Sequence, residues 1–302
     1  MKVFINRKPV SGPWGGGNKT VSALASALEP HASVVFDLDH SDIDVIFCFD
    51  PRPCPQGVWY QHFLDYREKH GCKIIQRVGD VGTHGKPDLF SLVSQSTNLS
   101  DFIIFPSEWA RNEINYRKDN YKVISNAPLD RFYLNRDKRD VPAQKLNIVT
   151  HHWSTNTMKG FDIYEKLGEY CINRDDIRFT YIGRYPSSAK TAGINLIDPK
   201  DIDFLSKEIP MHDIYLTASK LEAGANHVLE ALAAGLPVIY REGGGSIDEY
   251  CKDYGERYSD FNSLVSAIEK VSSTYPDYKG RALNFSLTIE ETIKKYLDII
   301  LL

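Results

Sequence analysis

Short apolar runs with the character of β-strands alternate along this chain with longer stretches in which apolar residues recur at helical spacing. This alternation predicts an α/β fold in which parallel strands are joined by crossover helices. In the first half of the chain, the runs with strand character are residues 2–7, 33–38, 45–49, 73–78, 102–106 and 122–125. These strands predict one complete doubly wound sheet.

A polar, charged stretch at residues 135–144 (NRDKRDVPAQ) lacks any apolar period, and we interpret it as a linker. The alternation then begins again, with candidate strands at residues 146–150, 178–182, 194–197, 213–217 and 237–240. The pattern predicts an N-terminal Rossmann-like domain at 1–140 and a C-terminal one at 145–285. Thr288 and Glu291 form a capping-box pattern ahead of apolar residues at helical spacing, which predicts a final helix within 286–302. We expect this helix to pack back toward the N-terminal domain.

Composition narrows the class of protein. The 302 residues are 42% hydrophobic, and 36 Lys and Arg against 40 Asp and Glu give a net charge of −4. That balance offers no bulk attraction to nucleic acid, so we expect no nucleic-acid partner. The five cysteines are scattered and include no Cys-x-x-Cys pair, which argues against a disulfide framework or a structural zinc. Since no apolar run is long enough for a signal peptide or a transmembrane segment, we expect a cytoplasmic protein, with peripheral attachment to a membrane left open.

The segment at residues 213–250, DIYLTASKLEAGANHVLEALAAGLPVIYREGGGSIDEY, carries the candidate chemistry. It predicts a strand, a loop, a helix and a second strand that leads into a glycine-rich loop, because Gly235 suits the left-handed end of a helix and Pro237 blocks its continuation. Glu222 falls in the first loop and Glu230 on the helix. Parallel sheets bind ligands at the carboxyl ends of their strands, and the start of a helix offers free amides to an anion.

Glu222 and Glu230 have the chemistry to hold a sugar nucleotide. An ionised carboxylate only accepts hydrogen bonds, and a sugar or a ribose diol presents two donors side by side. Two such carboxylates can hold the two ends of the molecule while helix amides hold the diphosphate between them. The alternative for each residue is a glutamate on a solvated surface, which is the commoner place for a single Glu.

The stretch SKLEAGANHVLEALAAGLPVIYREGGG resembles the nucleotide-binding signature of the retaining GT-B glycosyltransferase family (glycosyl transferases group 1, family 4-like). The shared features are two Glu separated by seven residues, a run of small residues, Gly-x-Pro-Val-Ile and a glycine-rich loop. The resemblance implies a GT-B fold of two Rossmann-like domains facing across a cleft, with the nucleotide-sugar donor on the second. It also implies that Glu222 contacts the donor sugar and that Glu230 binds the ribose hydroxyls. The remaining donor-binding positions that it implies are Gly224, Ala225 and Asn226.

Two other segments extend the resemblance. Gly15-Gly16-Gly17 is similar to the family's N-terminal glycine loop, which implies that Gly16 and Gly17 approach the donor phosphate. The segment MKGFD at residues 158–162 is similar to the family's Lys-Gly-Phe segment, which implies that Lys159 neutralises the diphosphate. A fixed cation at that place stabilises the charge that grows on the leaving group, and so stabilises the transition state more than the ground state.

One position departs from the pattern of the family. Ser154 stands where an Arg is usual, five residues before Lys159. His151, His152 and Arg184 are the candidate replacements for the missing cation. For the two adjacent histidines, a purely structural role at the end of a strand is the alternative.

The N-terminal half is expected to bind the acceptor. Its loop at residues 77–86, RVGDVGTHGK, follows a predicted strand and contains glycines that allow close approach. We select Asp80 and His84 as candidates for the polar catalytic group that faces the reacting carbon.

A P-loop nucleotide phosphohydrolase or kinase is the main competing class of protein. The residues from Gly12 to Thr20 read GPWGGGNKT, and Asp50 follows a strand in the manner of a magnesium-binding carboxylate. In a P-loop, however, the Lys directly follows the last glycine, whereas here Asn18 separates Lys19 from it. The P-loop class also leaves the segment with Glu222 and Glu230 unexplained.

A dinucleotide-binding protein and a metal-dependent transferase fit the sequence less well. A dinucleotide site lacks the third glycine of Gly-x-Gly-x-x-Gly, and the Asp-x-Asp pairs at residues 37–39 and 42–44 are interpreted as surface turns rather than a metal motif. A non-catalytic sugar-binding protein would share the architecture, but such proteins are usually exported. A catalytically inactive member of the family stays open.

The sequence thus predicts a retaining, metal-independent glycosyltransferase that needs no cofactor. It would move a sugar from a nucleoside-diphosphate sugar to an unidentified glycan, lipid or small-molecule acceptor. Retention of the anomeric configuration of the sugar is implied by the resemblance, and not by composition or spacing. One sequence gives no readable code for the base and sugar of the donor.

Overall fold

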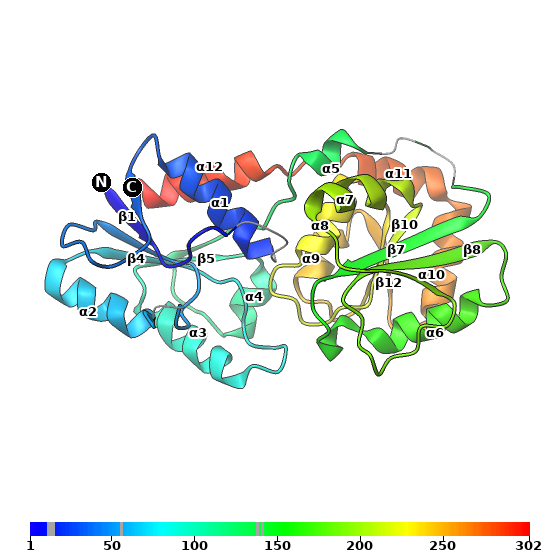
Figure 1. Cartoon of the computed structure of the whole chain (residues 1–302), viewed down its shortest axis with the longest axis horizontal. Helices are drawn as coiled ribbons and strands as arrows, with labels where there is room; N and C mark the ends of the chain where they lie inside the picture. Colours follow the sequence, from blue (N-terminus) through cyan, green and yellow to red (C-terminus); the bar gives the residue numbers. More distant parts are fainter. Residues whose placement is uncertain (11–15, 55–56, 137–138, 140–141) are drawn as a thin grey trace. The chain divides into compact units, whose positions relative to one another are not determined.

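The computed structural model describes residues 1–10, 16–54, 57–136, 139 and 142–302. The chain folds as two compact units, whose elements are labelled in Figure 1. Unit 1 comprises Met1–Asn126 with Ile289–Leu302, and unit 2 comprises Ala127–Thr288. The stretch that follows residue 126, which the sequence pattern assigned to the N-terminal domain as far as residue 140, thus lies in unit 2.

Unit 1 is built on a six-stranded parallel sheet with the strand order β2-β1-β3-β4-β5-β6. Its strands are β1 (Lys2–Ile5), β2 (Ser33–Val35), β3 (Val45–Cys48), β4 (Lys73–Arg77), β5 (Phe102–Phe105) and β6 (Tyr121–Val123). Every residue of the apolar strand β3 is buried, as expected for a parallel strand that is covered on both faces. The sequence pattern had predicted all of these strands, with ends up to three residues longer.

The helices of unit 1 are α1 (Gly16–Leu28), α2 (Tyr60–His70), α3 (Pro87–Leu99), α4 (Glu108–Glu113) and α12 (Ile289–Ile300). Figure 1 shows α12, in red, alongside α1, in blue. Ile293, Tyr296 and Ile299 of α12 join the core that Val3 and Leu24 also form. The last helix of the chain therefore completes a core whose other elements come from the first half.

Unit 2 contains a second six-stranded parallel sheet, with the order β12-β11-β10-β7-β8-β9. Its strands are β7 (Leu146–His152), β8 (Ile177–Gly183), β9 (Ile194–Ile197), β10 (Ile214–Thr217), β11 (Val238–Arg241) and β12 (Gly255–Tyr258). The two sheets confirm the predicted pair of Rossmann-like domains. Strand β12 was not predicted, because its sequence GERY has two charged residues and lacks an apolar run.

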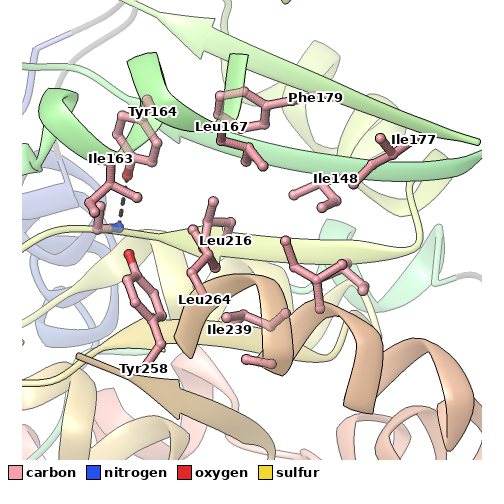
Figure 2. Close-up of a cluster of buried hydrophobic side chains, with 14 of the residues drawn as sticks. Ile148, Ile163, Tyr164, Leu167, Ile177, Phe179, Leu216, Ile239, Tyr258 and Leu264 are labelled. Carbon is pink, nitrogen blue, oxygen red and sulfur yellow. Dashed lines mark hydrogen bonds between the residues drawn. The ribbon is translucent and has the colours of Figure 1, made fainter. Parts of the chain in front are cut away.

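The helical elements of unit 2 are α5 (Arg131–Leu134), η1 (Thr157–Lys159), α6 (Phe161–Cys171), α7 (Ile202–Glu208), η2 (Ile209–Met211), α8 (Asn226–Ala233), α9 (Ser246–Cys251), α10 (Phe261–Ser273) and α11 (Tyr275–Leu283). Successive residues of each strand point to opposite faces of the sheet. Ile148 and Leu216 pack on one face against α6 and α10, in the cluster that Figure 2 shows. Val149 and Tyr215 pack on the other face against α8 and α9.

Arg136 ties the first part of unit 2 to the rest of that unit. Its guanidinium donates hydrogen bonds to three backbone carbonyl oxygens, at 2.9 Å to Ala233, 2.6 Å to Leu283 and 2.8 Å to Phe285. Burial lowers the pKa of Arg136 from its usual value, but an arginine stays charged at neutral pH. These bonds join Arg136 to the carboxyl ends of α8 and α11.

The five cysteines are free thiols, and all but Cys54 are buried. Within the described ranges, no helix is both long enough and apolar enough to cross a membrane.

Candidate functional site

The carboxyl ends of β7, β8, β10 and β11 lie side by side in the sheet of unit 2, because these strands are parallel and adjacent. The loops that follow them contain every candidate residue of the second half, apart from those on α8 and at the end of β7. Such an edge is the usual ligand-binding edge of an open α/β sheet.

Lys159 and Glu222 form an ion pair at this edge. The Lys159 ammonium donates to Oε1 of Glu222, and the two side chains are only 13% and 14% exposed. Lys159 ends the short helix η1, whose first turn is capped by the side chain of Asn156, at 2.9 Å from the amide of Met158. The structure therefore brings together the two residues for which the sequence predicted contacts with the diphosphate and with the donor sugar.

Gly160 allows this approach. Its φ of +80° lies in the left-handed region that favours glycine. A Cβ at this position would lie 2.3 Å from the carbonyl oxygen of Ala218, in the loop that carries Glu222. The backbone after Lys159 thus packs directly on that loop, and only a glycine fits there.

The loop with Glu222 is held by main-chain bonds to the glycine-rich loop after β11. The amide of Glu222 donates to the carbonyl oxygen of Gly244 at 3.0 Å, and the amide of Ser246 donates to the carbonyl oxygen of Glu222 at 2.8 Å. The amide of Leu221, whose φ is +52°, donates to Gly243 at 3.0 Å. The glycine-rich loop therefore fixes the position of the Glu222 backbone.

The start of α8 differs in one respect from the expectation. The sequence resemblance implied that Ala225 and Asn226 present their amides to the donor. The amide of Ala225 instead donates to Oγ of Ser246 at 3.0 Å. Asn226 is the first residue of α8, where an amide has no acceptor within the helix. Gly224 precedes both in the half-buried part of the loop.

Glu230 lies in the second turn of α8 and is 5% exposed. Its Oε2 is 2.8 Å from Nε2 of His151 on β7. The other ring nitrogen of His151, Nδ1, is 3.0 Å from the hydroxyl of Tyr215 on β10. A solvated position for Glu230 is therefore excluded, and its carboxylate belongs to a buried chain of three polar side chains.

The neighbouring His152 has a different environment, because adjacent residues of a strand face opposite sides of the sheet. Its Nε2 is 2.7 Å from the hydroxyl of Tyr164 on α6, and that hydroxyl accepts the amide of Ala218 at 3.0 Å, the bond drawn as a dashed line in Figure 2. His227 of α8 packs edge-on against His152, with ring centroids 4.9 Å apart, and bonds to Thr217.

Burial keeps two of these three histidines neutral. It holds the pKa of His152 well below its usual value, and it lowers the pKa of His227 to about 3. An uncharged imidazole does not neutralise a diphosphate, so the lowered pKa favours Arg184 over His152 as the replacement for the cation missing at Ser154. His151 bonds to Glu230, so its ring is also engaged within the protein.

Arg184 is the remaining candidate for that cation. It directly follows β8, and its guanidinium carbon lies 4.2 Å from the ring centroid of Trp153, which directly follows β7. The strand register pairs His152 with Gly183, so the two next residues are neighbours across the ends of the strands. Stacking on an indole holds a guanidinium flat and leaves its N–H edges able to donate.

The candidates of the first half lie in unit 1. Gly16 and Gly17 begin α1, whereas Gly15 falls outside the described residues. The carboxylate of Asp80 accepts the amide of Gly82 at 2.8 Å and pairs with Lys86 at 2.6 Å, so it organises its own loop. His84 lies in the following turn and is half-buried.

The carboxylate considered for a P-loop magnesium site has arginine partners instead. Asp50 lies 2.7 Å from a guanidinium nitrogen of Arg52 and 3.2 Å from one of Arg7. Residues 12–15 of that motif fall outside the described part of the chain. Among the residues that the structure describes, no group of three or more His, Cys, Asp or Glu side chains is arranged to hold a metal ion.

Comparison with known proteins gives a match in structure but not in sequence. No model of a known protein family matches the chain, and no curated protein matches it. HepE from Anabaena, solved in complex with UDP, superposes with a TM-score of 0.75 at 12% identity over 99% of this chain and 98% of its own. HepE has also been solved with UDP-glucose.

Two further solved structures extend this similarity. Sucrose-phosphate synthase from Thermosynechococcus elongatus superposes with a TM-score of 0.70 at 12% identity, covering 99% of this chain and 97% of its own. WaaG, a glycosyltransferase involved in lipopolysaccharide biosynthesis, gives 0.68 at 14% identity, covering 99% of each chain. Superposition over nearly whole chains confirms the predicted two-domain GT-B fold. It does not favour the P-loop class.

The sequence pattern did not identify Tyr215, Tyr164, Thr217 or His227 as parts of the site. Tyr215 and Thr217 lie inside an apolar strand, where a periodic pattern assigns them to the core. The hydrogen bonds that they make join segments far apart in the chain. The one local signal was the pair of adjacent histidines, because two polar side chains at the end of a strand place one on each face.

The fit of Gly160 gives a first prediction. Gly160→Ala is expected to destabilise the protein by roughly 1–3 kcal/mol, because alanine is strained at this φ and its Cβ would meet Ala218. Gly280→Ala is the matched control, since Gly280 lies in α11 with open space around its Cβ and should gain up to about 1 kcal/mol of helix propensity. Urea unfolding of both variants measures the difference. Equal stability of the two variants would contradict the close packing at Gly160.

Proposed function

We propose that this protein is a retaining glycosyltransferase that moves a sugar from a nucleoside-diphosphate sugar to a glycan, lipid or small-molecule acceptor. The observation that carries the proposal is the Lys159–Glu222 ion pair beside the buried Glu230, at the ligand-binding edge of unit 2. The same fold holds UDP-glucose in HepE, which supports this class of donor.

Glu222 accepts hydrogen bonds from the hydroxyls of the donor sugar, and Glu230 accepts those of the ribose. Lys159 reaches the diphosphate without leaving Glu222, because an ammonium group has three N–H donors. The amide of Asn226, at the start of α8, faces the same anion. These residues thereby contact both the sugar and the diphosphate, the two groups joined by the bond that breaks in the transfer.

The leaving diphosphate gains negative charge as the sugar departs. Lys159 and Arg184 stabilise that charge as fixed cations, and they stabilise it more in the transition state than in the bound donor. We infer that these side chains take the place that a metal ion has in other transferases, and that unit 1 supplies the acceptor site with Asp80 or His84 as its polar group.

A nucleotide screen tests the class of ligand. We expect thermal shift without magnesium to show a preference for one of UDP, GDP and ADP over ATP. Glu230→Ala should weaken that diphosphate at least about tenfold, because a hydrogen bond to a charged group contributes roughly 1.5–3 kcal/mol. Tight, magnesium-dependent binding of ATP that survives Glu230→Ala would overturn the proposal in favour of the P-loop class.

Glu222→Ala separates sugar positioning from nucleotide binding. The nucleoside diphosphate should bind this variant within about threefold of the wild type, whereas transfer or donor hydrolysis should fall at least about tenfold. Glu242→Ala is the control, because Glu242 lies in the neighbouring loop with an exposed side chain that pairs with Arg257. Unchanged turnover of Glu222→Ala in a donor-hydrolysis assay would remove Glu222 from the mechanism.

Arg184→Gln tests the replacement cation. The measured quantity is the ratio of affinities for the nucleoside diphosphate and for the nucleoside without phosphates, which isolates the phosphate contacts. We expect this ratio to fall about tenfold, as for loss of one charge-assisted hydrogen bond. Arg174→Gln, which removes an exposed arginine paired with Asp176 in the same unit, should leave the ratio unchanged. A wild-type ratio in Arg184→Gln would exclude Arg184 as a phosphate ligand.

A further inference from the structure

Three polar side chains from three separate elements form one buried chain in unit 2. Tyr215 comes from β10, His151 from β7 and Glu230 from α8. The hydroxyl of Tyr215 is 3.0 Å from Nδ1 of His151, and Nε2 of His151 is 2.8 Å from the carboxylate of Glu230. Tyr215 is fully buried, His151 is 8% exposed and Glu230 is 5% exposed.

A buried carboxylate needs a hydrogen-bond donor that stays directed at it. His151 supplies one in either protonation state. In the neutral ring, the Tyr215 hydroxyl donates to Nδ1, so the proton sits on Nε2 and points at Glu230. In the charged ring, both nitrogens donate, and the Tyr215 hydroxyl turns to the carbonyl oxygen of His151, 3.4 Å away. Nε2 therefore donates to the carboxylate in both cases.

The surroundings restrict the ring further. The amide of His151 also donates to the Tyr215 hydroxyl, at 3.2 Å, so the same hydroxyl is bound to the backbone and the ring of one residue. The ring of His227 lies edge-on to that of His151, with centroids 6.4 Å apart, and its own Nε2 is 3.0 Å from Thr217. His151 is thus held on two sides and presents one N–H to Glu230.

A donor fixed in this way sets the plane of the carboxylate. An ionised carboxylate has about four acceptor positions, so the bond from His151 is compatible with further bonds from the two hydroxyls of a ribose. Two neighbouring hydroxyls are matched only when the carboxylate has the right orientation. A carboxylate free to rotate would accept one hydroxyl nearly as well as two.

We propose that His151 is a positioning residue that orients Glu230 toward the ribose diol, with Tyr215 fixing the ring, and that this chain makes the site selective for ribonucleotides over 2′-deoxyribonucleotides. The proposal rests on the proposed function, in which Glu230 binds the ribose. It adds a specificity and two residues that the resemblance did not supply.

Calorimetry measures the affinities for UDP and for 2′-deoxy-UDP, and the ratio of the two is the quantity of interest. If another nucleoside diphosphate binds more tightly than UDP, the same ratio is measured for that nucleotide and its 2′-deoxy form. The wild type should prefer the ribonucleotide by about tenfold or more, as for one hydrogen bond to a charged group. In His151→Phe the preference should fall below about threefold, through weaker binding of the ribonucleotide while the deoxy form changes little.

Two amide variants separate positioning from packing. Gln places its amide near the position of Nε2 and can reach Glu230, whereas Asn places its amide near Nδ1 and cannot. His151→Gln should keep most of the preference and His151→Asn should lose it. These two variants decide the question if His151→Phe does not fold. His212→Phe is the control, because His212 is a buried histidine of the same unit whose ring bonds to the backbone of Glu208.

The outcomes distinguish the two proposals. If the wild type binds UDP and 2′-deoxy-UDP equally, the ribose role of Glu230 fails, and the positioning role fails with it. If Glu230→Gln abolishes the preference while His151→Asn and His151→Phe retain it, the ribose role stands and the positioning role is overturned. Non-additive losses in the double variant His151→Phe/Glu230→Gln are expected, since both changes remove the same interaction.

Discussion

The site in unit 2 depends on the cost of burying polar side chains. A buried carboxylate or imidazole without a partner loses its hydration and gains nothing in return. Beneath the carboxyl ends of β7 and β10, each buried histidine is therefore bonded to a hydroxyl or a carboxylate. Those bonds connect the sheet to α6 on one face and to α8 on the other. The chemistry at the surface of the site rests on this partnered layer.

The layer also decides which side chains carry charge. Burial favours the neutral forms of His152 and His227, whereas Lys159 and Arg184 are charged side chains that follow the ends of β7 and β8. Each has a partner that holds it in place: a carboxylate for Lys159 and an aromatic face for Arg184. In the proposed function, Arg184 at the end of the neighbouring strand takes the place of the arginine that Ser154 replaces in the sequence resemblance.

The sequence was sufficient for the fold, and its local patterns selected several residues of the candidate site. Strand alternation located both sheets, because apolar runs are a local property. It missed β12 because the sequence of that strand has two charged residues and no apolar run. Glu222 and Glu230 were found because the spacing of one loop and one helix places them. The partner of Glu230 was not found, because His151 is 79 positions away and the two meet only through the packing of α8 on the sheet. The sequence also assigned residues 127–136 to the first domain. They belong to unit 2, where Arg136 bonds to carbonyl oxygens about a hundred or more positions away in the chain.

The way in which Glu222 is held has a consequence for how this site can change. Main-chain bonds between residues 221–222 and residues 243–246 hold its backbone in place. Main-chain bonds survive most substitutions. Side chains of these two loops can therefore vary while the carboxylate keeps its place. Under the proposed function, an evolving or engineered variant can therefore exchange one sugar for another through side chains of these loops while the main-chain bonds that hold Glu222 stay in place.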